Sequence, residues 1–170
     1  MPHKQLSAER GVSPNTTTIM IFTEGTVLGP KNILGLYFHA NYIPIGNCRE
    51  KIRSWAEQGA EIVYITSRKT GKQVNEIHFL LAKYDFPGTR LYYREKNQKY
   101  KDIVEEVMPD ILIEDDCWSI GGKWQMCITH VKPGLKERIE SIVVKEFKGI
   151  DHLPDLLPAL LDYNSNKREG

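Results

Sequence analysis

Short apolar runs alternate with longer segments of helical periodicity through the first two thirds of the chain. Four of the runs have the length of a buried strand: 18–22, 61–66, 89–94 and 110–114. Three segments between them repeat apolar residues every three or four positions, which predicts helices: 47–58, 72–84 and 98–107. This alternation predicts a Rossmann-like α/β domain, a three-layer sandwich with a mainly parallel sheet covered by helices.

Two of the predicted helices carry capping residues at their starts. Asn47 stands three residues before Glu50, and Thr70 stands three residues before Gln73, which is the spacing of a capping box. Gly59 follows the first of these helices, where a glycine commonly ends the last turn. These residues place helix boundaries but indicate no chemistry.

The pattern is weaker after residue 117. It predicts an additional strand at 123–131, a short helix beginning within 132–140, a buried strand at 141–147 and a closing helix at 153–163. Polar residues dominate both ends of the chain. We therefore expect a flexible tail at 1–17, a single domain at 18–162 and a second flexible tail at 163–170.

Composition narrows the class of protein. The chain has 170 residues, and its 41% hydrophobic content is enough for one buried core. Its 23 basic and 22 acidic residues leave a net charge of +1, so no broad field attracts nucleic acid or an anionic membrane. The cysteines, Cys48, Cys117 and Cys127, are odd in number and lack CxxC spacing. With no apolar run of membrane-spanning length, we expect a cytoplasmic protein with reduced thiols.

Polar side chains stand at the ends of three predicted strands, where a parallel sheet binds its ligands. The segments are Phe22-Thr23-Glu24-Gly25-Thr26, Thr66-Ser67-Arg68 and Glu114-Asp115-Asp116, with Lys96, Lys99 and Lys101 ahead of the last strand. Adjacent carboxylates repel each other, so a hard cation such as Mg²⁺ would stabilise their ionised forms. A hydroxyl and a lysine would hold phosphoryl oxygens beside that cation. The set therefore predicts phosphate chemistry.

In this order, the segments resemble the haloacid dehalogenase-like (HAD) superfamily, most of whose members are Mg²⁺-dependent phosphatases. "IVYITSR" and "PDILIEDDCWSIGG" look especially like its capless members, including the deoxyribonucleotidase-like branch. The resemblance implies a catalytic acid/base at Glu24 and Mg²⁺ ligands at Asp115 and Asp116. It also implies phosphate binding by the substrate-binding residues Thr66, Ser67 and Lys101.

The resemblance fails at Phe22, which stands where the family has its nucleophilic aspartate. A phenylalanine can neither form an aspartyl-phosphate nor bind a metal. Two functions follow. The retained acids favour a divergent phosphohydrolase in which Glu24 acts on a metal-bound water without a covalent intermediate. The lost nucleophile favours a catalytically inactive protein that binds a ligand or a protein partner. A different reaction in a drier pocket is a third, weaker alternative.

The segment between the first loop and the second strand is short. "LGPKNILGLYFHANYIPI" cannot supply a large cap domain, so we expect an open site. An open site suits a phosphorylated macromolecule, or closure of the site by a partner subunit. The expected ligand is a phosphorylated small molecule or macromolecule. The apolar stretch at 33–45 also predicts an interface that would form a homo-oligomer.

Overall fold

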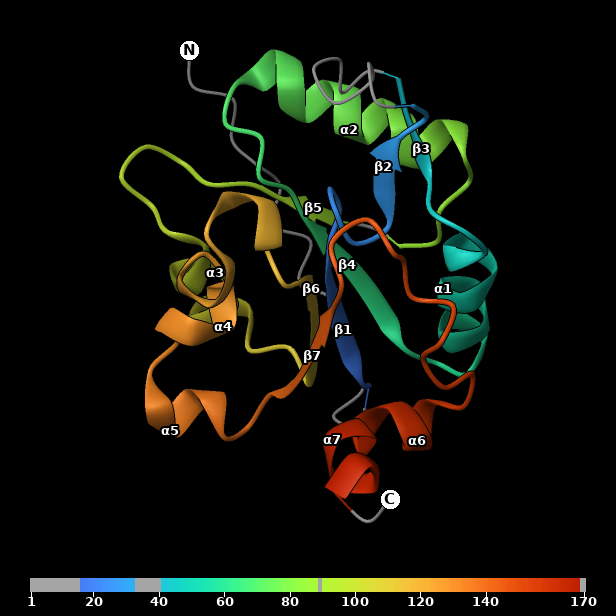
Figure 1. Cartoon of the computed structure of the whole chain (residues 1–170), viewed down its shortest axis with the longest axis vertical. Helices are drawn as coiled ribbons and strands as arrows, with labels where there is room; N and C mark the ends of the chain where they lie inside the picture. The colour runs from blue at the N-terminus through green and yellow to red at the C-terminus, as the bar shows by residue number, and fades with distance from the viewer. Residues whose placement is uncertain (1–15, 33–40, 89, 169–170) are drawn as a thin grey trace.

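A single parallel sheet forms the centre of the protein. The structure is a computed structural model, and it describes residues 16–32, 41–88 and 90–168. The sheet has the strand order β5-β4-β1-β6-β7 (Figure 1). Its strands are β1 (Thr18–Phe22), β4 (Glu61–Ile65), β5 (Arg90–Tyr92), β6 (Ile111–Asp115) and β7 (Glu140–Val144). All neighbouring strands are parallel, which confirms the predicted α/β class.

The central strand β1 is buried on both faces. Ile19 and Ile21 pack into one core cluster, whereas Met20 and Phe22 contribute to the other. This division follows from the strand period of two, which sends alternate side chains to opposite faces. A continuous apolar run is what such a doubly covered strand requires.

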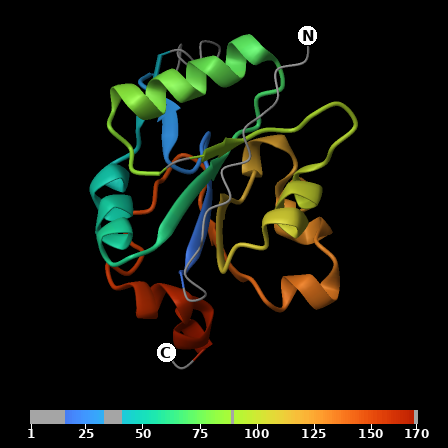
Figure 2. The same ribbon diagram turned by 180° about the vertical axis from the view of Figure 1, so that it is seen from behind.

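Helices cover both faces of the sheet, as two opposite views show (Figures 1 and 2). On one face lie α1 (Cys48–Glu57) and α2 (Gly71–Lys83), with Trp55 fully buried in the first cluster. On the other lie α3 (Tyr100–Val107) and the single turn α4 (Cys127–His130). The Thr70 hydroxyl accepts a hydrogen bond from the Gln73 amide as predicted, but Asn47 makes no side-chain cap. The Asn47 backbone amide instead donates a hydrogen bond to the Asp151 carboxylate.

A small hairpin follows β1. It consists of β2 (Leu28–Pro30) and β3 (Tyr42–Pro44), which pair antiparallel. Within the described residues, this hairpin and α1 lie between β1 and β4. Most of the predicted 33–45 interface, residues 33–40, lies outside the described residues. Of the remainder, Tyr42 is buried.

The region after β6 differs from its predicted structure. The strand expected at 123–131 is replaced by the 3₁₀ turn η4 (Gly122–Trp124) and by α4. Two amides of α4 are capped by the Glu114 carboxylate, and the position beside β6 is taken by β7. The 3₁₀ turn η3 (Trp118–Ile120) precedes η4, and α5 (Pro133–Lys136) precedes β7.

The predicted closing helix is shorter in the structure, and a further helix follows it. The closing helix α6 spans only Leu157–Leu161, and α7 (Tyr163–Arg168) lies within the segment expected to be a flexible tail. The Asn164 side chain donates hydrogen bonds to Glu140 and Ser141, so α7 is attached to the edge strand β7. None of the described helices has the length and apolar character needed to cross a bilayer.

Candidate functional site

The candidate site lies at the carboxyl edge of the sheet, where parallel strands all end together. The structure brings Glu24, after β1, against Thr66 and Ser67, after β4. It separately brings Asp115 and Asp116 together with Glu146, which follows β7. The site therefore has two parts, an anion pocket filled by Glu24 and an acidic cluster.

The Glu24 carboxylate is bound on both oxygens. Its Oε1 accepts hydrogen bonds from the Thr66 hydroxyl at 2.6 Å and from Arg68 Nε at 2.7 Å. Its Oε2 accepts from the Thr23 hydroxyl and from the Ser67 amide, the latter at 3.3 Å. The Glu24 side chain is only 8% exposed. A carboxylate held in this way is fully paired inside the protein.

These contacts fix the charge of Glu24. Burial alone would raise the pKa of Glu24, but the hydrogen bonds from Thr23 and Thr66 and the charge of Arg68 outweigh it and lower that pKa. Glu24 is thus ionised at neutral pH. An ionised carboxylate can accept a proton but has none to give.

Thr66 and Ser67 present donors of the kind expected for a phosphate. A hydroxyl, a backbone amide and a guanidinium together are typical ligands of an anion. Here those donors bind Glu24, so the anion in this pocket belongs to the protein itself. The sequence places Arg68 directly after these two residues, and that position was the available signal for its part in the pocket.

Phe22 belongs to an aromatic wall beside this pocket. Its ring meets Tyr100 edge to face, with the ring centroids 5.5 Å apart, and packs against the second core cluster. The Tyr100 hydroxyl donates to the Ser67 carbonyl at 3.3 Å. Burial raises the pKa of Tyr100, which keeps this phenol protonated. The side chain at position 22 therefore supports packing where the resemblance would place a nucleophile.

Lys101 lies apart from these residues. Its ammonium is 3.4 Å from Asp102 and 3.7 Å from Glu105, both on the same helix α3. Among the described residues, no hydrogen bond or ion pair joins Lys101 to Thr66 or Ser67. Its neighbour Tyr100 is the residue of α3 that reaches the pocket. Phosphate binding by Lys101 stays a prediction that the described contacts do not support.

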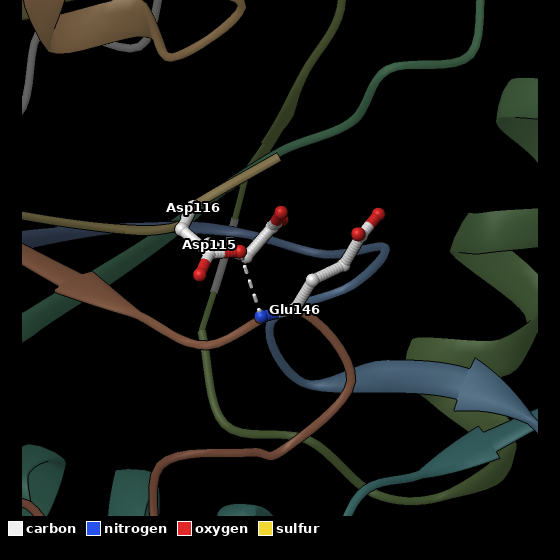
Figure 3. A group of neighbouring side chains, drawn as sticks. All are labelled: Asp115, Asp116 and Glu146. Carbon is white, nitrogen blue, oxygen red and sulfur yellow. Dashed lines mark hydrogen bonds between the residues drawn. The ribbon is translucent and has the colours of Figure 1, made fainter. Parts of the chain in front are cut away.

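The acidic cluster combines three carboxylates from two strand ends (Figure 3). One ligand atom from each of Asp115, Asp116 and Glu146 lies within 4.8 Å of the others. Sequence reasoning identified the two aspartates and missed Glu146. The expected strand at 141–147 contained Glu146, which hid its place at a strand end; the observed strand β7 ends at Val144, two residues before it.

Three consecutive backbone amides bind the cluster. The Cys117 amide donates to Asp115 at 2.8 Å, and the Trp118 amide donates to Asp116 at 3.3 Å. The Ser119 amide donates to Glu146 at 2.8 Å. The turn that begins η3 thus orients every carboxylate of the cluster.

Gly25 leaves room for Asp115. The glycine has a φ of +81°, and a Cβ at this position would lie 2.7 Å from Asp115 Oδ2. The same oxygen accepts a hydrogen bond from the Thr26 hydroxyl at 3.3 Å. Burial, and then the negative charge of Glu146, raise the pKa of Asp115. A bound cation would offset both effects.

Glu114 does not join the cluster. Strand alternation turns it to the opposite face, where its carboxylate accepts hydrogen bonds from the Cys127 amide at 2.6 Å and the Ile128 amide at 2.9 Å. Burial raises the pKa of Glu114 to about 7. Of the three consecutive acids in the sequence, only Asp115 and Asp116 therefore face the site.

Comparison with known proteins finds the fold but no close relative. No family model matches the sequence, and no curated protein matches it either. A chain of the Pnkp1/Rnl/Hen1 RNA repair complex superposes with a TM-score of 0.58 at 13% identity, over 84% of this chain and 47% of that one. A second structure of that complex gives 0.54 at 13% identity, over 86% and 52%. This chain thus spans about half the length of those chains.

A further match is weaker. D,D-heptose 1,7-bisphosphate phosphatase from B. bronchiseptica, complexed with magnesium and phosphate, gives a TM-score of 0.47 at 10% identity, over 89% of this chain and 99% of that one. Together with the strand order, the likenesses to the two structures of the repair complex support an α/β fold with a parallel sheet. At these identities they establish the fold alone.

Proposed function

We propose that this protein is a divalent-cation-binding protein of HAD-like fold in which Glu24 fills the phosphate pocket, so that the resting protein binds ligands without hydrolysing phosphate esters. One observation carries the proposal. The donors that would hold a phosphate, namely the Thr66 hydroxyl, the Ser67 amide and the Arg68 guanidinium, all bind the Glu24 carboxylate. A phosphate dianion entering the pocket would have to displace an ionised, paired carboxylate.

The acidic cluster fits a hard cation such as Mg²⁺. Asp115, Asp116 and Glu146 offer carboxylate oxygens, the ligands that Mg²⁺ and Ca²⁺ prefer. Mutual repulsion between three carboxylates is costly without a positive charge. When bound, the cation would neutralise this charge and polarise an oxygen of a ligand held beside it. The amides of residues 117–119 keep the three side chains oriented for this role.

The chemistry of the pocket opposes the usual phosphatase reaction. Phe22 supplies no nucleophile, and its ring packs against Tyr100. Glu24 is ionised, so it cannot protonate a leaving group at neutral pH. The lowered pKa of Glu24 also weakens it as a base. A covalent mechanism would therefore lack both its nucleophile, at position 22, and its proton donor, at position 24.

A metal-dependent phosphohydrolase without a covalent intermediate is the second candidate. The observation that favours it is the same ionised Glu24, since a base must be ionised before it accepts a proton from water. This candidate requires Glu24 to leave Arg68 when a phosphorylated small molecule or macromolecule binds. Its substrate would then occupy Thr66 and Ser67, next to a Mg²⁺ held by Asp115 and Asp116.

Cation binding is tested by titration calorimetry with Mg²⁺ and, separately, Ca²⁺. The native protein should bind one ion, and Asp115→Asn and Asp116→Asn should each lose that binding. Asp162→Asn is a matched control, because it removes an exposed acid on the short connection between α6 and α7. The absence of binding in the native protein, or equal loss in the control, would contradict the proposal.

A further inference from the structure

A basic depression lies beside the candidate site and takes no part in the function proposed above. Its volume is about 340 Å³. It is lined by residues from the loops that follow β4 and β5, namely Lys69, Arg94, Glu95, Lys96, Asn97 and Gln98. Three cations and one acid give it an excess of positive charge, although the whole chain is nearly neutral.

Among the described residues, these three cations have no acidic partner. Across the part of the chain that the structure describes, no carboxylate lies within ion-pair distance of Lys69, Arg94 or Lys96. Two neighbouring cations are paired, since Arg68 contacts Glu24 and Lys101 contacts Asp102. Like charges gathered in one depression repel each other unless an anion joins them.

Arg94 provides an independent sign of a missing partner. Its Nε is a buried nitrogen with no hydrogen-bond acceptor, and no other buried side-chain nitrogen or oxygen of the described residues is left in this way. The guanidinium lies 4.0 Å over the Tyr100 ring. Stacking of this kind fixes the plane of an arginine, which prepares it to bind an anion.

The loop that carries Lys96 is also fixed. The Glu95 amide donates to the Gln98 side chain at 3.0 Å, and the Gln98 amide donates to the Glu95 carbonyl at 3.1 Å. Asn97 adopts a left-handed conformation, with a φ of 67°, that closes the turn. A closed turn presents its side chains at little further entropic cost.

We propose that Lys69, Arg94 and Lys96 form a binding pocket for a phosphate group. A phosphate group carries up to two charges and several acceptor oxygens, which match two ammonium groups and one guanidinium. The pocket is separate from the one that Glu24 fills. A phosphate bound by these three residues does not contact the Glu24 carboxylate, and its binding needs no divalent cation.

The test is titration calorimetry with inorganic phosphate in the presence of EDTA, at low ionic strength, with sodium chloride of equal ionic strength as the comparison. The native protein should bind one phosphate and should not respond to chloride. Affinity should fall about tenfold or more in Arg94→Met and in the double variant Lys69→Met/Lys96→Met. Lys69 and Lys96 are exposed, so the double variant leaves the core unchanged.

A matched variant distinguishes this pocket from nonspecific attraction to surface lysines. Lys123→Met removes an exposed lysine from η4 and should bind phosphate as the native protein does. No saturable binding by the native protein, or equal loss in Lys123→Met, would overturn the proposal.

Discussion

The Glu24 carboxylate pairs with Arg68 at 2.7 Å in a setting where the two side chains are only 8% and 17% exposed. The sequence separates these residues by 44 positions, and the parallel pairing of β1 with β4 brings them together. A pair this deeply buried is costly to break on one side, because the remaining charge stays without a partner. The pair therefore holds the pocket in its filled state.

Removing the Glu24 carboxylate should open the pocket. Glu24→Ala leaves the Thr66 hydroxyl, the Ser67 amide and Arg68 without their anion, so stability should fall by about 3 kcal/mol or more. Phosphate should then bind at a second site and restore part of that stability. Chemical denaturation with and without phosphate measures both effects. A stability unchanged within about 0.5 kcal/mol would show that the pair is not formed in solution.

Acid stability should depend on the same carboxylate. The pKa of Glu24 lies below its ordinary value of 4.5, so its contribution is present above about pH 4.5 and is lost as the pH falls through the folded-state pKa. The free energy of unfolding of Glu24→Gln should therefore fall less on acidification than that of the native protein. Denaturation series at several pH values measure the two slopes. Parallel slopes would contradict the assignment of a lowered pKa.

Glu146 should contribute to cation binding although the sequence did not single it out. Glu146→Gln keeps the size of the side chain but removes one charge from the cluster. We expect its affinity for Mg²⁺ to fall at least about tenfold. Glu137→Gln, which changes an exposed glutamate just after α5, is the matched control. Equal affinities of Glu146→Gln and the native protein would remove Glu146 from the site.

We expect position 25 to require glycine, because its φ is positive and because a Cβ there would lie too close to Asp115. Gly59→Ala is a fitting comparison, because Gly59 also has a positive φ but nothing lies within 4 Å of its Cβ position. The comparison variant should lose about 1–2 kcal/mol from backbone strain alone. Gly25→Ala should lose more, and only Gly25→Ala should weaken Mg²⁺ binding. Equal losses, with Mg²⁺ binding intact in both, would show that the contact with Asp115 does not matter.

The sequence predicted the fold well where apolar periodicity was strong. The strands at 18–22 and 61–65 fall where the apolar runs stand, because doubly covered strands must be apolar throughout. The region after β6 was harder. An apolar stretch such as 126–128 fits a strand or a helical turn equally. The Glu114 carboxylate accepts hydrogen bonds from two amides of this stretch and so stabilises the helical turn.

The site was predictable only in part for a similar reason. Strand ends identified Asp115, Asp116 and Thr66, because residues that follow parallel strands share one edge of the sheet. The direction in which a side chain turns from that edge is set by packing. Lys101 forms an ion pair with Glu105 on its own helix, and Glu24 forms one with Arg68. Neither contact could be derived from spacing in the sequence.

The most direct test is hydrolysis of a broad panel of phosphate esters with Mg²⁺, measured for the native protein beside Asp115→Asn. The filled pocket and the phenylalanine at position 22 predict no turnover by the native protein above the level of the variant. Turnover by the native protein that disappears in Asp115→Asn would contradict the central claim and would establish a phosphohydrolase that works without an aspartyl nucleophile.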